Sequence, residues 1–356
     1  MSRGRNKLNT LKKPLVLIMG PYPPPSGGVS IHIKRLASIL KGDFDLDFID
    51  EAKIEKPGIF NLRSFNIGQY IKKIWNADVL FIHSGSSALK IVHILFGKVF
   101  GKEIILTIHS YHGKSDLKKA VDRIFFNLST KIIIVNSNIQ ERLRLKQGKY
   151  LVMNAFLPPI MSDEPELPDW ITEWISNQKE KGKQIICANA WRLEVFNNED
   201  LYGLDLCISV TNRLIEKGIK AAFIFVISSD SSLDPTYHHH VSVIEKLNIK
   251  DSFLLVNENL SFVKLIERSD IVVRPTNTDG DALTIREGLY LGKPVIASDV
   301  VNRPEGTILF KNRDEADLEK QLEHIINMIS NNETIAKGSH LIDFSKFYTE
   351  LIKSIV

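Results

Sequence analysis

This sequence of 356 residues contains only two cysteines, Cys187 and Cys207, and each lies inside an apolar run. So small a number excludes a disulfide framework, and the spacing fits no zinc motif, so we expect a reducing, cytoplasmic compartment.

Long hydrophobic runs are also missing, since the best candidate, ALKIVHILFGKVFG, is interrupted by Lys90, His93 and Lys98. A spanning helix needs about 20 apolar residues, so we expect a protein that does not cross a membrane.

A net charge of only +4 conceals a strong asymmetry between the two halves of the chain. Residues 1–160 carry 25 Lys and Arg against 11 Asp and Glu, a net of +14, whereas residues 161–356 carry 21 against 31, a net of −10. The asymmetry indicates two modules with different partners, and it favours an anionic partner for the first. We expect the basic half to rest on the anionic inner face of the plasma membrane; the alternative is ordinary solvated charge.

Short apolar runs alternate with helical periods in both halves, which predicts parallel strands joined by helices. Two such halves of similar size predict an α/β fold of two Rossmann-like domains that face each other across a cleft. The expected boundaries are 1–158 for the first domain, 159–182 for a proline-rich linker, and 183–340 for the second domain, with a last helix over 341–356. Ligands of such sheets bind in the loops that follow the strands.

The loop after the first strand reads GPYPPPSGGVSIH, and its bare backbone at Gly27 and Gly28 directly precedes a helix. Exposed amides at a helix N-terminus bind anions. The loop is neither a Walker A motif nor a GxGxxG fingerprint, and a plain tight turn is the alternative. His109 follows another strand and is positioned to touch a ligand; His83 is a weaker candidate of the same kind.

Charged residues follow two strands of the second half. Arg192 would meet an anionic ligand there, although a surface ion pair with Glu194 or Glu199 is the commoner outcome. In RPTNTDGDALTIREGLYLGKP, Asp279 precedes a helix and Glu287 lies two turns into it. These carboxylates can bind hydroxyls of one elongated ligand while the helix N-terminus binds phosphate. The alternative is a capped helix with solvated carboxylates.

Three adjacent histidines, His238, His239 and His240, form the densest group of potential metal ligands. Neighbouring side chains on a helix point about 100° apart, so the three cannot converge on one ion. We expect a polar surface helix and no metal site here.

Together, PPPSGGVSIH, LTIHSYHG, Arg192 and TDGDALTIREGLYLGKPVIAS resemble the group 1, family 4-like glycosyltransferases. These are retaining enzymes of the GT-B fold that use nucleotide sugars, and their C-terminal helix commonly returns to the first domain. The resemblance covers nearly the whole chain, and its most specific part is the pair of acidic residues from Asp279 to Glu287.

The resemblance implies a role for each matching residue. Glu287 would bind the ribose of the nucleotide, Asp279 the donor sugar, and His109 would lie beside the transferred sugar. Arg192 would be the phosphate cation, and Gly27 and Gly28 would close over donor phosphate or acceptor. The remaining donor-binding positions would hold the diphosphate through backbone amides: Gly280, Asp281, Ala282 and Leu283.

Two positions depart from the family pattern. Asp279 stands where Glu is usual, and Tyr202 stands before Gly203 where a second phosphate-binding Lys is usual. Because a hydrogen bond to a charged group contributes about 1.5–3 kcal/mol, another cation must replace the lysine if the donor is to be bound. Arg274 is the first candidate, followed by Arg303 and Lys311.

The sequence therefore predicts a hexosyltransferase that uses a nucleoside diphosphate sugar and no cofactor, metal or nucleic acid. The expected acceptor is a carbohydrate or lipid-linked molecule, in bacterial surface polysaccharide synthesis. Two alternatives remain at this point: a catalytically degenerate subunit that binds nucleotide sugar or glycan, and a nucleotide-sugar epimerase on the same fold.

Overall fold

The computed structural model describes residues 13–24, 27–111, 113, 115–280, 282–333 and 343–356. The chain divides into two compact units, Met1–Leu157 with Ile342–Val356, and Pro158–Leu341. We call them the first and the second unit. No helix among the residues that the structure describes is long and apolar enough to span a membrane.

The first unit is built on a seven-stranded parallel sheet in the order β3-β2-β1-β4-β5-β6-β7. Its central strands are apolar and fully buried because helices cover both faces, as expected for a parallel sheet. The strand order reverses between β1 and β4, which is where such sheets bind ligands. The strands are β1 (Leu15–Gly20), β2 (Asp45–Asp50), β3 (Phe60–Asn61), β4 (Val79–Ile82), β5 (Glu103–Ile108), β6 (Lys131–Ile134) and β7 (Tyr150–Val152).

The helices of the first unit each turn an apolar face to this sheet. Helix α1 begins where Gly27 ends the loop after β1, and it buries Ile33, Leu36 and Leu40. The helices are α1 (Gly28–Leu40), α2 (Ile67–Asn76), α3 (Ser87–Val99), α4 (Asp116–Phe126) and α5 (Ser137–Leu143), with a short 3-10 turn at Leu62–Ser64.

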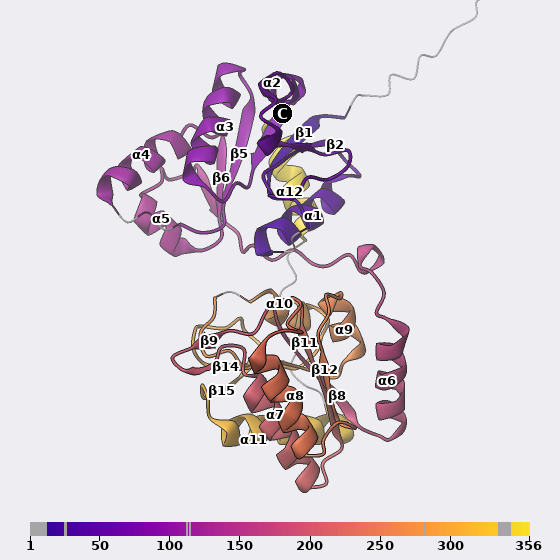
Figure 1. Cartoon of the computed structure of the whole chain (residues 1–356). Coiled ribbons are helices and arrows are strands. Elements are labelled where there is room, and N and C mark those ends of the chain that lie inside the picture. The colour runs from indigo at the N-terminus through magenta and orange to yellow at the C-terminus, as the bar shows by residue number, and fades with distance from the viewer. Residues whose placement is uncertain (1–12, 25–26, 112, 114, 281, 334–342) are drawn as a thin grey trace, which may run out of the picture. The chain divides into compact units, whose positions relative to one another are not determined.

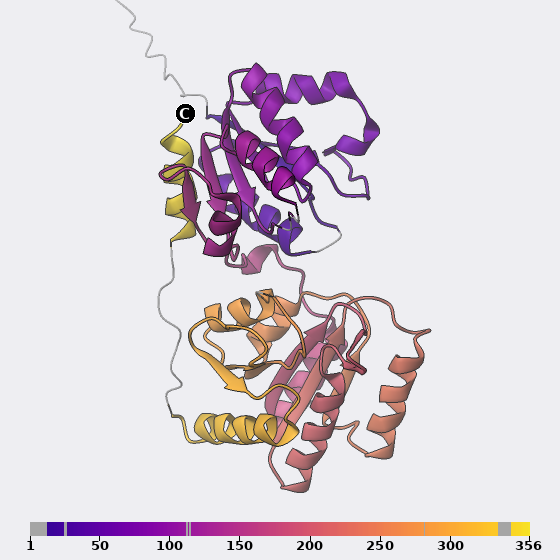
Figure 2. The ribbon, with the colours of Figure 1, turned by 90° about the vertical axis from the view of Figure 1, so that its left-hand side faces the viewer.

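The last helix, α12 (Phe344–Lys353), belongs to the first unit, although the second unit separates it in sequence. It packs on α1 (Figure 1), and it buries Tyr348 completely; Figure 2 shows it as the yellow helix at one side of the first unit. Lys353 pairs with Asp43 at 2.9 Å. The predicted return of the C-terminal helix to the first domain is therefore confirmed for the described part; Leu341 and Ile342 lie outside it.

The second unit has a six-stranded parallel sheet in the order β12-β11-β8-β13-β14-β15. Its order reverses between β8 and β13. The strands are β8 (Gln184–Ala190), β11 (Ala221–Ile227), β12 (Phe253–Val256), β13 (Ile271–Arg274), β14 (Val295–Ser298) and β15 (Thr307–Phe310). A separate hairpin joins β9 (Val195–Phe196) to β10 (Glu199–Asp200).

Helices cover both faces of this sheet as well. Helix α7 turns a broad buried face to the sheet, which includes Leu206, Cys207 and Val210. The helices are α6 (Asp169–Glu180), α7 (Leu204–Glu216), α8 (Pro235–Lys246), α9 (Phe262–Arg268), α10 (Leu283–Tyr290) and α11 (Glu315–Ser330), and Met161–Asp163 forms a 3-10 turn.

The predicted α/β class with two Rossmann-like units is confirmed. The sequence patterns overlooked α2, whose apolar positions Ile67 and Trp75 remain exposed, and the short strands at Phe60–Asn61 and Tyr150–Val152. They also placed all three histidines 238–240 on a polar surface. His240 is buried instead, because it lies on the face of α8 that turns inward with Ile244.

Candidate functional site

The point where the strand order of the second sheet reverses brings together three loops. Arg274 ends β13, its guanidinium donates to the main-chain carbonyl of Asn189 in β8 at 3.3 Å, and Arg303 follows β14. Thr284, at the start of α10, donates to the Asn189 side chain at 3.0 Å. Residues from both sides of the reversal are thus held in one hydrogen-bonded group.

Asp279 is the centre of this group. It accepts from Arg274 through both carboxylate oxygens, at 3.1 and 3.2 Å, and from Arg303 at 2.8 Å. Thr276 and the main-chain amide of Gly280 donate to it as well. Burial alone would raise the pKa of Asp279, but the two guanidiniums outweigh it and hold the pKa below its usual range. Asp279 therefore carries a permanent charge and positions two cations.

Tyr202, which stands where the family pattern has a lysine, lies against one of these cations. The guanidinium carbon of Arg274 is 5.3 Å from the centre of the Tyr202 ring, a cation–π distance. Arg274 is thus fixed on one side by Asp279 and on another by Tyr202. Its side chain is 12% exposed, whereas that of Arg303 is only 2% exposed, so Arg274 is the more accessible of the two.

Arg192 lies in the loop after β8, as expected, but not in this group. Its side chain is 62% exposed and pairs with Glu194. The surface ion pair named above as the commoner outcome is therefore what the structure shows.

The start of α10 has the properties of an anion site. Ala282 occupies its N-cap position, and no described side chain caps the helix. A side chain at Gly280 would meet no atom within 4 Å, so packing does not require a glycine there. Glu287 lies in the same helix and is 6% exposed. Asp281 lies outside the described residues.

In the first unit, the predicted glycine loop precedes α1. Gly27 is the N-cap of α1, and its amide is satisfied by the Ser30 hydroxyl at 2.8 Å. A side chain would find open space at Gly28, and at Gly27 only the Ser30 hydroxyl at 3.9 Å. Packing therefore does not require a glycine at either position. Because neither residue has a side chain, the backbone at both positions stays accessible.

His109 directly follows β5 and is part of a histidine group. Its Nε2 lies 3.2 Å from Nδ1 of His83, and its ring centre lies 4.8 Å from that of His32 in α1. Burial, followed by the charge of His32 and of Lys90, lowers the pKa of His109 well below its usual range. His109 is therefore a neutral imidazole. His32 was not among the residues assigned from the sequence, because only the fold brings it beside His109.

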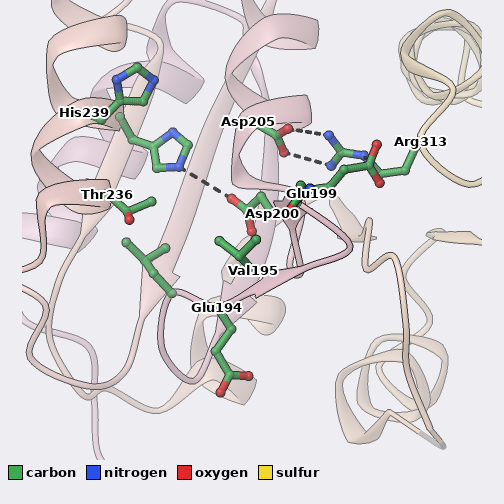
Figure 3. Close-up of a pocket in the computed structure, with 11 residues that line it drawn as sticks. Glu194, Val195, Glu199, Asp200, Asp205, Thr236, His239 and Arg313 are labelled. Carbon is green, nitrogen blue, oxygen red and sulfur yellow. Dashed lines mark hydrogen bonds and ion pairs between the residues drawn. The ribbon is translucent and has the colours of Figure 1, made fainter.

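A hollow of about 310 Å³ lies beside the β9–β10 hairpin (Figure 3). Four carboxylates line it, and two of them, Asp205 and Glu199, already pair with Arg313. Burial, followed by the neighbouring Asp205, raises the pKa of Asp200 in its wall to about 6. With four carboxylates in its lining, the hollow has the wrong charge for a diphosphate.

No family model matches this sequence, and no curated protein matches it either. Solved structures do resemble it. A glycosyltransferase from Rickettsia africae superposes with a TM-score of 0.66 at 16% identity, over 96% of this chain and 98% of that one. Anabaena HepE in complex with UDP has a TM-score of 0.62 at 12% identity, over 95% and 99%. Sucrose-phosphate synthase from Thermosynechococcus elongatus has a TM-score of 0.57 at 14% identity, over 97% and 95%. The chain thus has the GT-B fold of these glycosyltransferases.

Proposed function

We propose that this protein is a retaining glycosyltransferase that moves a hexose from a nucleoside diphosphate sugar to a carbohydrate or lipid-linked acceptor. The observation that carries the proposal is that Arg274 and the start of α10, which no described side chain caps, lie together where the strand order of the second sheet reverses. The shared fold supports it, since structures of Anabaena HepE were solved with UDP and with UDP-glucose. Bacterial surface polysaccharide synthesis is the proposed setting.

The proposed chemistry is stabilisation of the leaving diphosphate. Arg274 and the first amides of α10 neutralise the charge that develops as the glycosidic bond breaks, and they are oriented before the reaction begins. Glu287 binds the ribose hydroxyls. Asp279 fixes Arg274 and Arg303, and in that way it orients the donor rather than acting as a nucleophile. His109 lies beside the transferred sugar and orients it.

A direct test is a thermal-shift screen of the purified chain with UDP-, GDP-, ADP- and TDP-sugars. A ligand at a concentration of 100 times its dissociation constant raises the free energy of unfolding by about 2.7 kcal/mol, and a thermal-shift screen detects a change of this size. The donor found in this way is then incubated with membrane extract as the source of acceptors, and sugar transfer and free nucleotide are measured. Transfer with the anomeric configuration retained is expected. No stabilisation by any nucleotide sugar would refute the proposal.

A catalytically degenerate subunit is the second candidate, and two side chains favour it. Arg192 is paired with Glu194, and Tyr202 replaces a lysine, so the phosphate site has fewer accessible cations than the family pattern provides. Binding of a nucleotide sugar without any transfer or nucleotide release, even with acceptors supplied, would identify this function.

We also propose that the first unit rests on anionic membrane. Helix α4 presents an apolar stripe to solvent, with Leu117 77%, Val121 37% and Ile124 61% exposed. These residues recur at spacings of four and three, so they lie on one face. Lysines and an arginine of the same helix accompany them: Lys118, Lys119 and Arg123. An exposed apolar stripe flanked by cations is the combination that binds the interface of an anionic bilayer.

Vesicle co-sedimentation tests this surface. Ile124→Glu is expected to abolish binding to vesicles rich in phosphatidylserine, and binding of the unaltered chain is expected to weaken with salt. Leu233→Glu is the matched control, because Leu233 is 93% exposed but lies in the second unit. Binding that depends on neither salt nor anionic lipid would contradict the proposal.

A further inference from the structure

Three histidine side chains converge at the carboxyl edge of the first sheet. His83 follows β4, His109 follows β5, and His32 comes from α1. Each offers one ring nitrogen, and these three nitrogens lie within 4.8 Å of one another. The strand order of this sheet reverses between β1 and β4, so the histidines surround the position where open α/β sheets bind ligands.

Two of these rings bury a nitrogen that no described residue satisfies. His32 and His83 are 3% and 0% exposed, and Nε2 of each has no hydrogen-bond partner within the part of the chain that the structure describes. Nδ1 of His32 lies 2.7 Å from the main-chain carbonyl of Ala155. Because a carbonyl can only accept, Nδ1 carries the proton and Nε2 keeps its lone pair. Buried polar atoms normally have partners, so these nitrogens indicate a missing one.

The electrostatic environment keeps all three rings neutral. Burial is the largest cause, and it lowers the pKa of His32 to about 4 and those of His83 and His109 well below their usual range. Neutral imidazole is the form that binds a metal ion.

We infer that His32, His83 and His109 form a binding site for a divalent first-row transition metal, for which Zn²⁺ is the natural probe. Three nitrogen donors suit zinc and exclude magnesium and calcium, which prefer oxygen. Three protein ligands leave a fourth position for water or a substrate hydroxyl, and the partial exposure of His109 gives access to it. The inference goes beyond the proposed glycosyl transfer, does not depend on it, and departs from the metal-free expectation.

The surroundings hold the rings in place in advance. The hydrogen bond from His32 to the Ala155 carbonyl is the kind of outer contact that orients metal-binding histidines. The Phe81 ring lies 4.6 Å from that of His83, and the Tyr348 ring of α12 lies 6.4 Å from that of His32. A side chain at Gly20 would come within 3.1 Å of Cβ of His83, so this glycine makes room for the histidine.

The test is metal uptake by the full chain after treatment with a chelator. Equilibrium dialysis against Zn²⁺ is expected to give one tightly bound ion per chain, and Co²⁺ is expected to give the visible spectrum of a four-coordinate site. His109→Gln, at the least buried of the three positions, is expected to weaken Zn²⁺ binding at least about 100-fold, since even outer contacts contribute 10–100-fold. His239→Gln is the control, because His239 is exposed on α8 of the second unit.

Three results would overturn the inference. The first is less than one bound zinc ion per unaltered chain. The second is a folded His109→Gln variant with unchanged affinity, and the third is loss of the ion in His239→Gln. If His109→Gln does not fold, X-ray absorption of the unaltered zinc complex decides: three imidazole ligands support the site, and any other ligand set refutes it.

Discussion

Arg274 is the residue that we propose as the replacement for a missing phosphate-binding lysine. The family pattern has a phosphate-binding lysine at the position of Tyr202, and a tyrosine carries no charge. The ring instead supports the Arg274 guanidinium, which Asp279 holds from another side. In our proposal, the cation that binds phosphate lies at the end of β13 and not in the loop before α7.

The first prediction is that Arg274→Ala weakens binding of the donor nucleotide sugar about 10–100-fold. A charged hydrogen bond contributes about 1.5–3 kcal/mol, and the alanine removes the accessible cation. Arg274→Lys keeps the charge but not the two-point contact with Asp279, so it should restore only part of the affinity. Calorimetric titration measures both.

Arg213→Ala is the control for this series. Arg213 also pairs with carboxylates of the second unit, but it lies on α7 and is 48% exposed. Unchanged donor affinity in Arg274→Ala would exclude Arg274 as the replacement for the lysine.

Helix α7 depends on two features of the residues just before it. Gly203 is its N-cap and has a φ of +69°, which side chains disfavour. Asp200 accepts hydrogen bonds from the main-chain amides of Tyr202, Gly203 and Leu204. Together they let the chain turn sharply from the β9–β10 hairpin into a buried helix.

The second prediction is that Gly203→Ala lowers the free energy of unfolding of the second unit by about 2–4 kcal/mol. The left-handed backbone conformation costs an alanine about 1–2 kcal/mol. In addition, the new Cβ would lie 2.4 Å from the Pro275 carbonyl oxygen, and this clash lowers the stability further. Denaturant titration measures the change.

Gly218→Ala separates the two causes. Gly218 has a φ of +72°, but no atom lies within 4 Å of its added Cβ, so only the backbone contribution remains. If the two variants lose equal stability, the close approach to Pro275 does not matter.

The third prediction concerns the pH dependence that Asp200 imposes. Its pKa is raised to about 6, so the folded state binds a proton that the unfolded state releases at a pH of about 4. This contribution therefore favours folding at low pH and is lost as the pH rises from about 4 through about 6. Relative to Asp200→Asn, the free energy of unfolding of the unaltered protein should fall by about 1–3 kcal/mol across that range.

The asparagine variant is a close match because Asn and Asp are equally good at binding free amides before a helix. The measurement is urea unfolding at a series of pH values. Parallel pH curves for the two proteins would contradict the raised pKa.

At the scale of the whole molecule, the chain passes through the second unit and then returns to the first. Tyr348 of α12 is completely buried in the first unit, near Phe81 and His32. The first unit is therefore incomplete until the last residues of the chain are present.

The fourth prediction is that Tyr348→Ala destabilises only the first unit. Truncation of a large buried aromatic side chain costs about 3–5 kcal/mol. In a unit of this size that lowers the melting temperature by roughly 6–20 °C. Differential scanning calorimetry should show one transition shifted and the other unchanged. Val356→Ala, at an exposed position of the same segment, should shift neither. Equal shifts of both transitions would contradict the assignment of α12 to the first unit.

The sequence by itself determined the alternation of buried strands and helices, and hence the two parallel sheets. Periodicity is a local property, so it can be read along the chain. It also located Gly27, His109 and Asp279 in loops next to strands or helices, and Glu287 inside the helix that follows Asp279, where the structure has them. The sequence patterns did not predict the short strands because their apolar periods are too brief. They did not predict α2 because apolar positions of this helix point to solvent.

Only the tertiary structure decided which of these residues act together. Asp279 meets Arg303 from the loop after β14, and His109 meets His32 from α1, because parallel strands distant in sequence end at one edge of a sheet. The same packing left Arg192 with Glu194 at the surface. Contacts of this kind depend on the strand order and on burial, and neither is encoded in the spacing of residues along the chain.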